Sequence, residues 1–135
     1  MSRKVKDREL INAFALPNGA ATTVSAGIDL QNSTTGEFEA GVEVEIEAPS
    51  LSTAQLPDTK TMIYDLYHDT ASGFGSEVLL ASAVVTQTGA SGAGAAAATN
   101  KVRLPSNVKR YIRAKATNSG TGNASAASAN LQLLF

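Results

Sequence analysis

The clearest strand signal in the chain lies at residues 40–47, which read AGVEVEIE. Small or apolar residues occupy every second position of this segment, and Glu43, Glu45 and Glu47 alternate with them. A period of two residues is typical of a β-strand that buries one face and exposes the other. The segment therefore predicts an amphipathic strand with one apolar face and one acidic face.

The same period of two recurs along the rest of the chain. It is present at residues 62–67, 78–84 and 111–116, and shorter apolar runs lie at residues 14–16, 24–30, 102–104 and 131–135. Turn signals such as Pro17-Asn18-Gly19 and Pro105 separate the runs, and no segment has the period of a helix. We therefore predict an all-β protein: an antiparallel β-sandwich or jelly roll of about eight strands, with an extended N-terminal arm.

Length and composition limit the organisation of the chain. A sequence of 135 residues without cysteine suits one domain and excludes disulfides and thiolate zinc sites. No apolar run approaches the roughly 20 residues that a membrane helix needs. The charged start, MSRKVKDRE, has no apolar segment behind it, so we predict that it is not a signal peptide. We predict a charged N-terminal arm at residues 1–9, a single β-sandwich domain at residues 10–135, and synthesis in the cytoplasm.

Charge is segregated along the chain, although the formal net charge is only −1. Residues 1–8 are mainly basic, residues 37–77 are mainly acidic, and residues 101–135 contain no acidic residue. Such segments can pair across a sheet or between neighbouring copies of the chain, and both interpretations stay open. Residues 86–100 and 117–130 consist mainly of Ala, Gly, Ser, Thr and Asn, which bury little surface alone. Something must therefore pack on them if they are ordered; a contact in an assembly and a contact in a crystal both stay open.

Candidate catalytic and metal-binding residues are few. His68 is the only histidine, and the pattern around it, with Asp65 and Asp69, favours a solvated strand end over an oxygen-rich metal site. The glutamates of residues 43–47 would lie about 7 Å apart on one strand face, which we interpret as solubility rather than a glycosidase pair. The glycine-rich residues 89–94 lack the Lys-Ser/Thr of a phosphate loop. We predict no enzymatic activity, no cofactor and no metal.

The most basic part of the chain is residues 103–115, RLPSNVKRYIRAK, which predict a turn followed by a strand. Only Tyr111 interleaves with the basic residues, whereas nucleic-acid stacking platforms need several aromatics, so we predict no nucleic-acid partner. Strand alternation places Tyr111 and Arg113 on one face and Arg110 on the apolar side, near its rim. Arg110 therefore needs a carboxylate, which mid-chain glutamates or a neighbouring subunit could supply. Arg and Tyr are frequent anchors of protein interfaces.

The order of these motifs resembles that of the capsid cement (decoration) proteins of short-tailed bacteriophages. The matching segments are GIDL (27–30), VEV (42–44), YDLYHD (64–69), VLLAS (78–82), VRLP (102–105) and KRYIR (109–113). A Thr/Gly/Ala-rich hairpin and a final apolar strand follow them. The resemblance covers residues 22–135 and leaves out the N-terminal arm.

The resemblance implies a jelly-roll virion protein that binds the outer surface of an icosahedral capsid at symmetry axes, after assembly in the host cytoplasm. It would stabilise the capsid by bridging neighbouring major capsid subunits, as a dimer or trimer, with no nucleic-acid or membrane partner. The predicted partner-binding residues are Arg3, Lys4, Lys6 and Arg8 in the arm and Arg103, Arg110, Tyr111 and Arg113 in the basic stretch. Two alternatives remain: a head-fibre or carbohydrate/receptor-binding β-sandwich, and a neck or tail structural protein.

Overall fold

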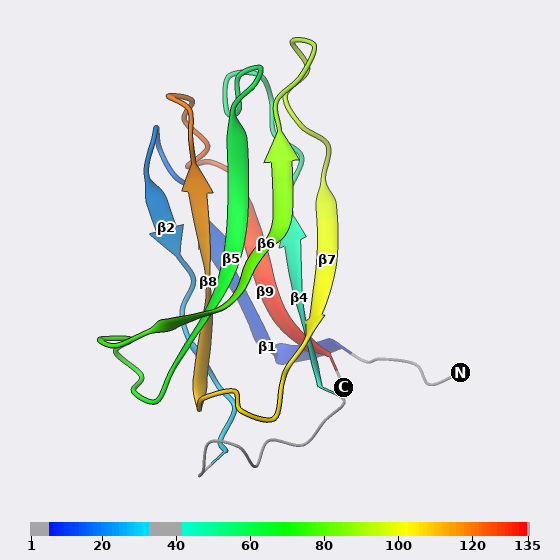
Figure 1. The fold of residues 1–135 in the computed structure, drawn as a ribbon. Helices are drawn as coiled ribbons and strands as arrows, with labels where there is room; N and C mark the ends of the chain where they lie inside the picture. Colours follow the sequence, from blue (N-terminus) through cyan, green and yellow to red (C-terminus); the bar gives the residue numbers. More distant parts are fainter. Residues whose placement is uncertain (1–5, 33–41, 135) are drawn as a thin grey trace.

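The computed structural model describes residues 6–32 and 42–134 of the chain. Within these ranges the protein forms nine strands in two antiparallel sheets, which confirms the predicted all-β sandwich (Figure 1). The strands are β1 (Lys6–Ala15), β2 (Thr22–Val24), β3 (Ile28–Asp29), β4 (Glu43–Ala48), β5 (Thr61–Asp69), β6 (Val78–Thr88), β7 (Ala98–Arg103), β8 (Tyr111–Asn118) and β9 (Ser128–Leu134).

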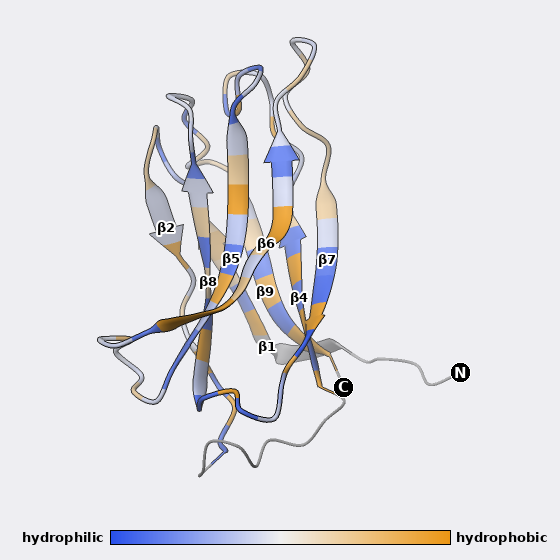
Figure 2. Cartoon of the chain, in the orientation of Figure 1, coloured by the Kyte–Doolittle hydropathy of each residue, from blue (hydrophilic) through white to orange (hydrophobic). Residues whose placement is uncertain are grey.

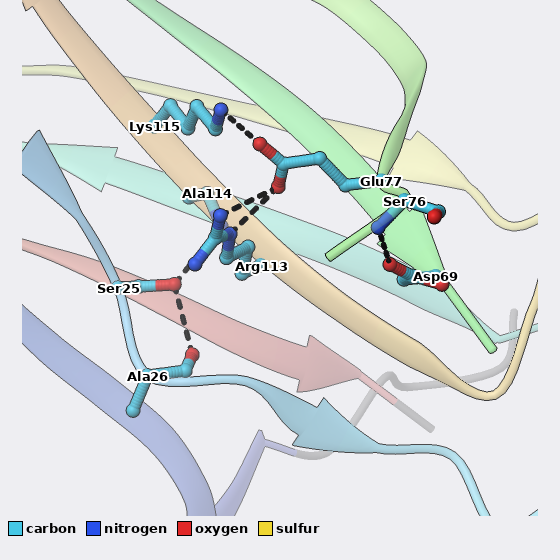
Figure 3. Close-up of polar contacts among 8 residues, drawn as sticks. All are labelled: Ser25, Ala26, Asp69, Ser76, Glu77, Arg113, Ala114 and Lys115. Carbon is cyan, nitrogen blue, oxygen red and sulfur yellow. Dashed lines mark hydrogen bonds and ion pairs between the residues drawn. The ribbon is translucent and has the colours of Figure 1, made fainter. Parts of the chain in front are cut away.

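The strand order is that of a jelly roll. One sheet has the order β1-β9-β4-β7 and the other the order β2-β8-β5-β6, with β3 also paired to β8. Ser25 joins β2 and β3 into one interrupted strand: its backbone N–H donates to the carbonyl of Ala114, and its hydroxyl accepts from the N–H of Ala114, both at 2.9 Å (Figure 3). With β2 and β3 merged, only the β5–β6 connection stays within one sheet. All other connections cross between the sheets, as in two interlocked Greek keys.

The core lies between the two sheets and is built by the alternation that the sequence predicts. On β5 the side chains of Met62, Tyr64 and Leu66 are fully buried, and on β8 those of Ile112 and Ala114 are as well. The residues between them are only half-buried and form the outer face of the five-stranded sheet. Each large apolar side chain buried in this way contributes roughly 1.5–3 kcal/mol to stability.

The first half of β6 departs from the predicted alternation at residues 78–84, so that prediction is wrong. The pairing of β6 with β5 shifts register twice between the pair Tyr64–Val85 and the pair Tyr67–Leu79. The shifts leave Leu80 and residues 82–84 without a paired residue on β5, whereas Val78 and Leu79 keep their pairs and are both exposed. Figure 1 shows this half of β6 running at a steep angle to the rest of its sheet.

The two low-complexity segments pack against the β4–β5 loop of the same chain. Leu51 and Ala95 exchange backbone hydrogen bonds of 2.8 and 2.9 Å. A Cβ atom on Gly94 would lie 1.9 Å from the carbonyl oxygen of Leu51, and one on Gly122 would lie 2.5 Å from that of Gln55. Glycine is required at these positions because two backbones touch there. The three loops β4–β5, β6–β7 and β8–β9 form what we call the loop end of the sandwich (Figure 1).

Candidate partner-binding site

The strand register gathers predicted partner-binding residues at the end of the sandwich opposite the loop end. Lys6 and Glu43 both pair with Leu134, and Glu43 also pairs with Arg103, so these residues form one row across the four-stranded sheet. β8 begins at the same end with Tyr111 (Figure 1). We call this the charged end, and define it by Lys6, Asp29, Glu43, Arg103 and Arg110.

Arg110 is oriented by a carboxylate of its own chain. Its Nε and Nη2 atoms donate to the two oxygens of Asp29 at 2.8 and 2.9 Å, which is the two-pronged geometry of a strong ion pair. The predicted need for a carboxylate is therefore met by Asp29 on β3, and not by a mid-chain glutamate or a neighbouring subunit. The hydrogen bond from Arg110 also holds the pKa of Asp29 below its usual range.

Arg110 nevertheless remains available for an outside partner. Its side chain is 46% exposed, and its Cζ atom lies 5.3 Å from the ring centroid of Tyr111. A guanidinium group has five donors, and two are used by Asp29. The remaining donors can bind an acceptor on another molecule while Asp29 keeps the group in place.

Arg113 lies two residues beyond Tyr111 on β8, and its guanidinium group binds partners within its own chain. Its Nε and Nη2 atoms both contact one carboxylate oxygen of Glu77 at 2.8 Å, and the ammonium group of Lys115 pairs with the other oxygen (Figure 3). The guanidinium also covers the ring of Phe74 at 4.4 Å, and Lys115 covers the ring of Tyr67 at 4.3 Å. These five residues form what we call the outer-face cluster.

The outer-face cluster fixes residues 70–77, the connection between β5 and β6, which we call the strap. Asp69 anchors it by accepting hydrogen bonds from the backbone N–H groups of Thr70, Ala71 and Ser76. Phe74 takes a positive φ of 53°, a strained value for a bulky residue, and its ring packs on Gly27. Since Gly27 lies beside β3, on the far side of β8 from β5, the strap crosses the outer face of β8.

His68 and Asp69 are buried, so the predicted solvated strand end is wrong. The Nδ1 atom of His68 accepts a hydrogen bond of 3.1 Å from the backbone N–H of Lys109, so Nε2 carries the proton. Burial, followed by the charge of Lys109, lowers the pKa of His68. The carboxylate of Asp65 accepts from the N–H of Ala83 in the β6 bulge, at 2.7 Å. Among the described residues, no three metal-ligating side chains are grouped together.

Glu45 is also buried, so the solubility interpretation is wrong for this glutamate. Its Oε1 atom accepts a hydrogen bond of 2.6 Å from Nε2 of Gln132 on β9, and Nζ of Lys101 lies 3.9 Å from its other oxygen. Glu47 makes a longer contact of 3.4 Å with the amide of Asn130. The acidic face of β4 is therefore part of the structure of the four-stranded sheet.

The remaining predicted residues belong to the start of the chain. Arg3 and Lys4 lie outside the described residues. Lys6 and Arg8 lie within β1, which begins at Lys6, inside the range predicted as an arm.

Sequence reasoning missed Asp29, Phe74 and Glu77 as members of the site, because each is isolated in the sequence and acquires its role only through the fold.

Comparison of the sequence with known proteins identifies no family for this chain. No protein-family model matches the sequence, and no curated protein matches it either. No helix among residues 6–32 and 42–134 is long and apolar enough to cross a membrane.

Proposed function

We propose that this protein is a capsid cement protein: it binds the outer surface of an icosahedral phage capsid at symmetry axes and bridges neighbouring major capsid subunits. The observation that supports this proposal is the charged end. Arg103, Arg110 and Tyr111 from the basic stretch gather there with Lys6, although the segments are far apart in the sequence. An exposed, oriented arginine beside a tyrosine is a common interface anchor.

The arrangement of the other motifs supports the same proposal. The segments YDLYHD, VLLAS and KRYIR lie on β5, on β6 and at the start of β8, which share one sheet. The outer-face cluster draws Tyr67 and Arg113 from two of these segments and ties them to the strap. Three segments whose order along the chain resembles that of cement proteins thus lie in one sheet.

The proposed mechanism is mechanical rather than chemical. A rigid sandwich that contacts two or more capsid subunits at once resists their separation under the pressure of packaged DNA. Each contact can be weak, since linked contacts raise the effective affinity by roughly 10²–10⁴-fold. Within this proposal the internal ion pairs of Arg113 keep the sandwich rigid, and Arg103, Arg110 and Tyr111 contact the major capsid protein.

A co-sedimentation experiment with empty expanded capsids of the encoding phage tests this proposal. We expect hundreds of copies to bind per particle, and we expect Arg103→Ala with Arg110→Ala to lower occupancy several-fold at subsaturating protein. Lys60→Ala is the matched control, because Lys60 is an exposed cation at the loop end, just before β5. Arg113→Ala is unsuitable as a contact variant, since it also disrupts the outer-face cluster.

The outcomes separate the alternatives. Full occupancy of the double variant would contradict the assignment of the charged end. Six or twelve copies per particle would instead favour a neck or tail protein. Binding to glycans with no affinity for capsids would favour a carbohydrate-binding or receptor-binding module.

A further inference from the structure

The first half of β6 is an edge strand that is protected by bulges but by no charged residue. β6 ends the order of the five-stranded sheet, and among the described residues β5 is the one strand that pairs with it. Val78 is 48% exposed and Leu79 is 47% exposed, the two highest values among the large hydrophobic residues described. Figure 2 shows the start of β6 coloured as hydrophobic.

The other edge strands carry the devices that normally prevent pairing. β1 begins with Lys6, Asp7, Arg8 and Glu9, β7 contains Lys101 and Arg103, and β2 and β3 have only three and two residues. Natural proteins use charged residues and short strands to protect sheet edges. β6, in contrast, has eleven residues, VLLASAVVTQT, and none of them is charged.

The open part of this edge can be delimited from side-chain hydrogen bonds. Asp65 accepts from the N–H of Ala83, and the amide of Asn100 donates to the carbonyl of Val84 at 2.8 Å. Side chains of the protein thus bind the backbone of β6 at Ala83 and Val84. Residues 78–82 precede this point, and a strand of that length spans roughly 17 Å.

We propose that residues 78–82 pair antiparallel with the same residues of a second copy of this chain, across a two-fold axis. An edge strand offers backbone donors and acceptors that another strand satisfies, and an uncharged strand can lie opposite itself without like-charge repulsion. The nearest charge, Glu77, is already paired with Arg113 and Lys115, so it does not repel its symmetry mate. A closed two-fold contact also covers Val78 and Leu79 of both copies.

Sedimentation velocity of the purified chain over a range of concentrations tests this inference. A short contact of this kind predicts a monomer–dimer equilibrium with a dissociation constant between about 1 µM and about 1 mM. Leu79→Lys should weaken dimerisation about tenfold or more, because a charge at the pairing edge opposes the contact. Val24→Lys is the matched control: Val24 is also exposed, at 44%, but lies on β2 at the opposite edge of the sheet.

Single-cysteine variants give a second readout, because the chain contains no cysteine. Leu80 lies at the centre of the segment that pairs with itself, so Leu80→Cys should form a disulfide-linked dimer on mild oxidation, and Val24→Cys should not. A monomer at all concentrations, a trimer, or a dimer that is insensitive to Leu79→Lys would overturn the inference. The test uses the chain alone, so its result is independent of capsid binding.

Discussion

Glu77 and Arg113 join the start of β6 to the outer face of β8 across the intervening strand β5. The Nε atom of Arg113 donates to Oε2 of Glu77 at 2.8 Å, and both side chains are more than four-fifths buried. This pair places the strap over the sheet and sets the direction in which β6 leaves it. Two carboxylates thus hold the strap: Glu77, shared between Arg113 and Lys115, and Asp69, which binds its backbone.

We expect Glu77→Gln to lower the free energy of unfolding by about 1–2 kcal/mol, between the values for exposed and fully buried ion pairs. Burial acts to raise the pKa of Glu77, but the hydrogen bonds and charges of Lys115 and Arg113 outweigh it and lower the pKa below 4.5. The contribution is thus present above about pH 4.5 and is lost as the pH falls through the lowered pKa. Urea unfolding at pH 7 measures the loss. Asp29→Asn is the control, since the exposed pair of Asp29 and Arg110 should matter less, and an equal loss would contradict the importance of burial.

His68 should make the protein less stable in mild acid. Its pKa is lowered in the folded state, so the unfolded chain binds protons more readily below pH 6.5. Stability therefore falls as the pH drops from 6.5 to the pKa of folded His68. Thermal unfolding between pH 7.5 and 5 should show this slope in the wild type and a reduced slope in His68→Asn, because an Asn oxygen can accept the bond from Lys109 without titrating. Identical slopes would show that His68 does not titrate differently on folding.

The loop end should tolerate glycine substitutions very unequally. Gly94→Ala should destabilise the protein by more than about 2 kcal/mol, because its Cβ would overlap the carbonyl of Leu51 and its φ is +69°. Gly92→Ala should cost about 1 kcal/mol, since φ is +64° there but the space is open. Gly75→Ala serves as a control outside the loop end: Gly75 lies in the strap, with open space and no positive φ, so the change should have little effect. Equal midpoints in urea for the three variants would contradict the close packing of Gly94.

The sequence predicts the sandwich well because its main signal is local. The alternation at residues 62–67 and 111–116 depends on the two faces of a single strand, and β5 and β8 follow it. The bulges of β6 leave no such signal, because VLLASAVV is apolar or small at nearly every position. The burial of Glu45 depends on a partner, Gln132, that is 87 residues away along the chain.

In the candidate site, too, the features with a local signal can be predicted and those that depend on distant partners cannot. Alternation alone places Arg113 and Tyr111 on one face and predicts that Arg110 needs a carboxylate. The identity of that carboxylate, Asp29, depends on the pairing of β3 with β8, which no local pattern reveals. The position of the strap cannot be predicted from local sequence for the same reason. The ring of Phe74 packs on Gly27, and the two residues are brought together only by the folded sheet.

The position of β9 has a consequence for how the protein is made. β9 lies between β1 and β4, so one sheet of the sandwich lacks an inner strand until the ribosome has translated residues 128–134. The β5–β6 hairpin can form early, whereas β1 must wait for a partner more than a hundred residues downstream. A nascent chain that stops before Ser128 leaves the backbone edges of β1 and β4 that face β9 without their partner. Translation of residues 128–134 is thus the step that supplies the missing inner strand, and we expect chains that stop before it to be substrates for chaperones and proteases.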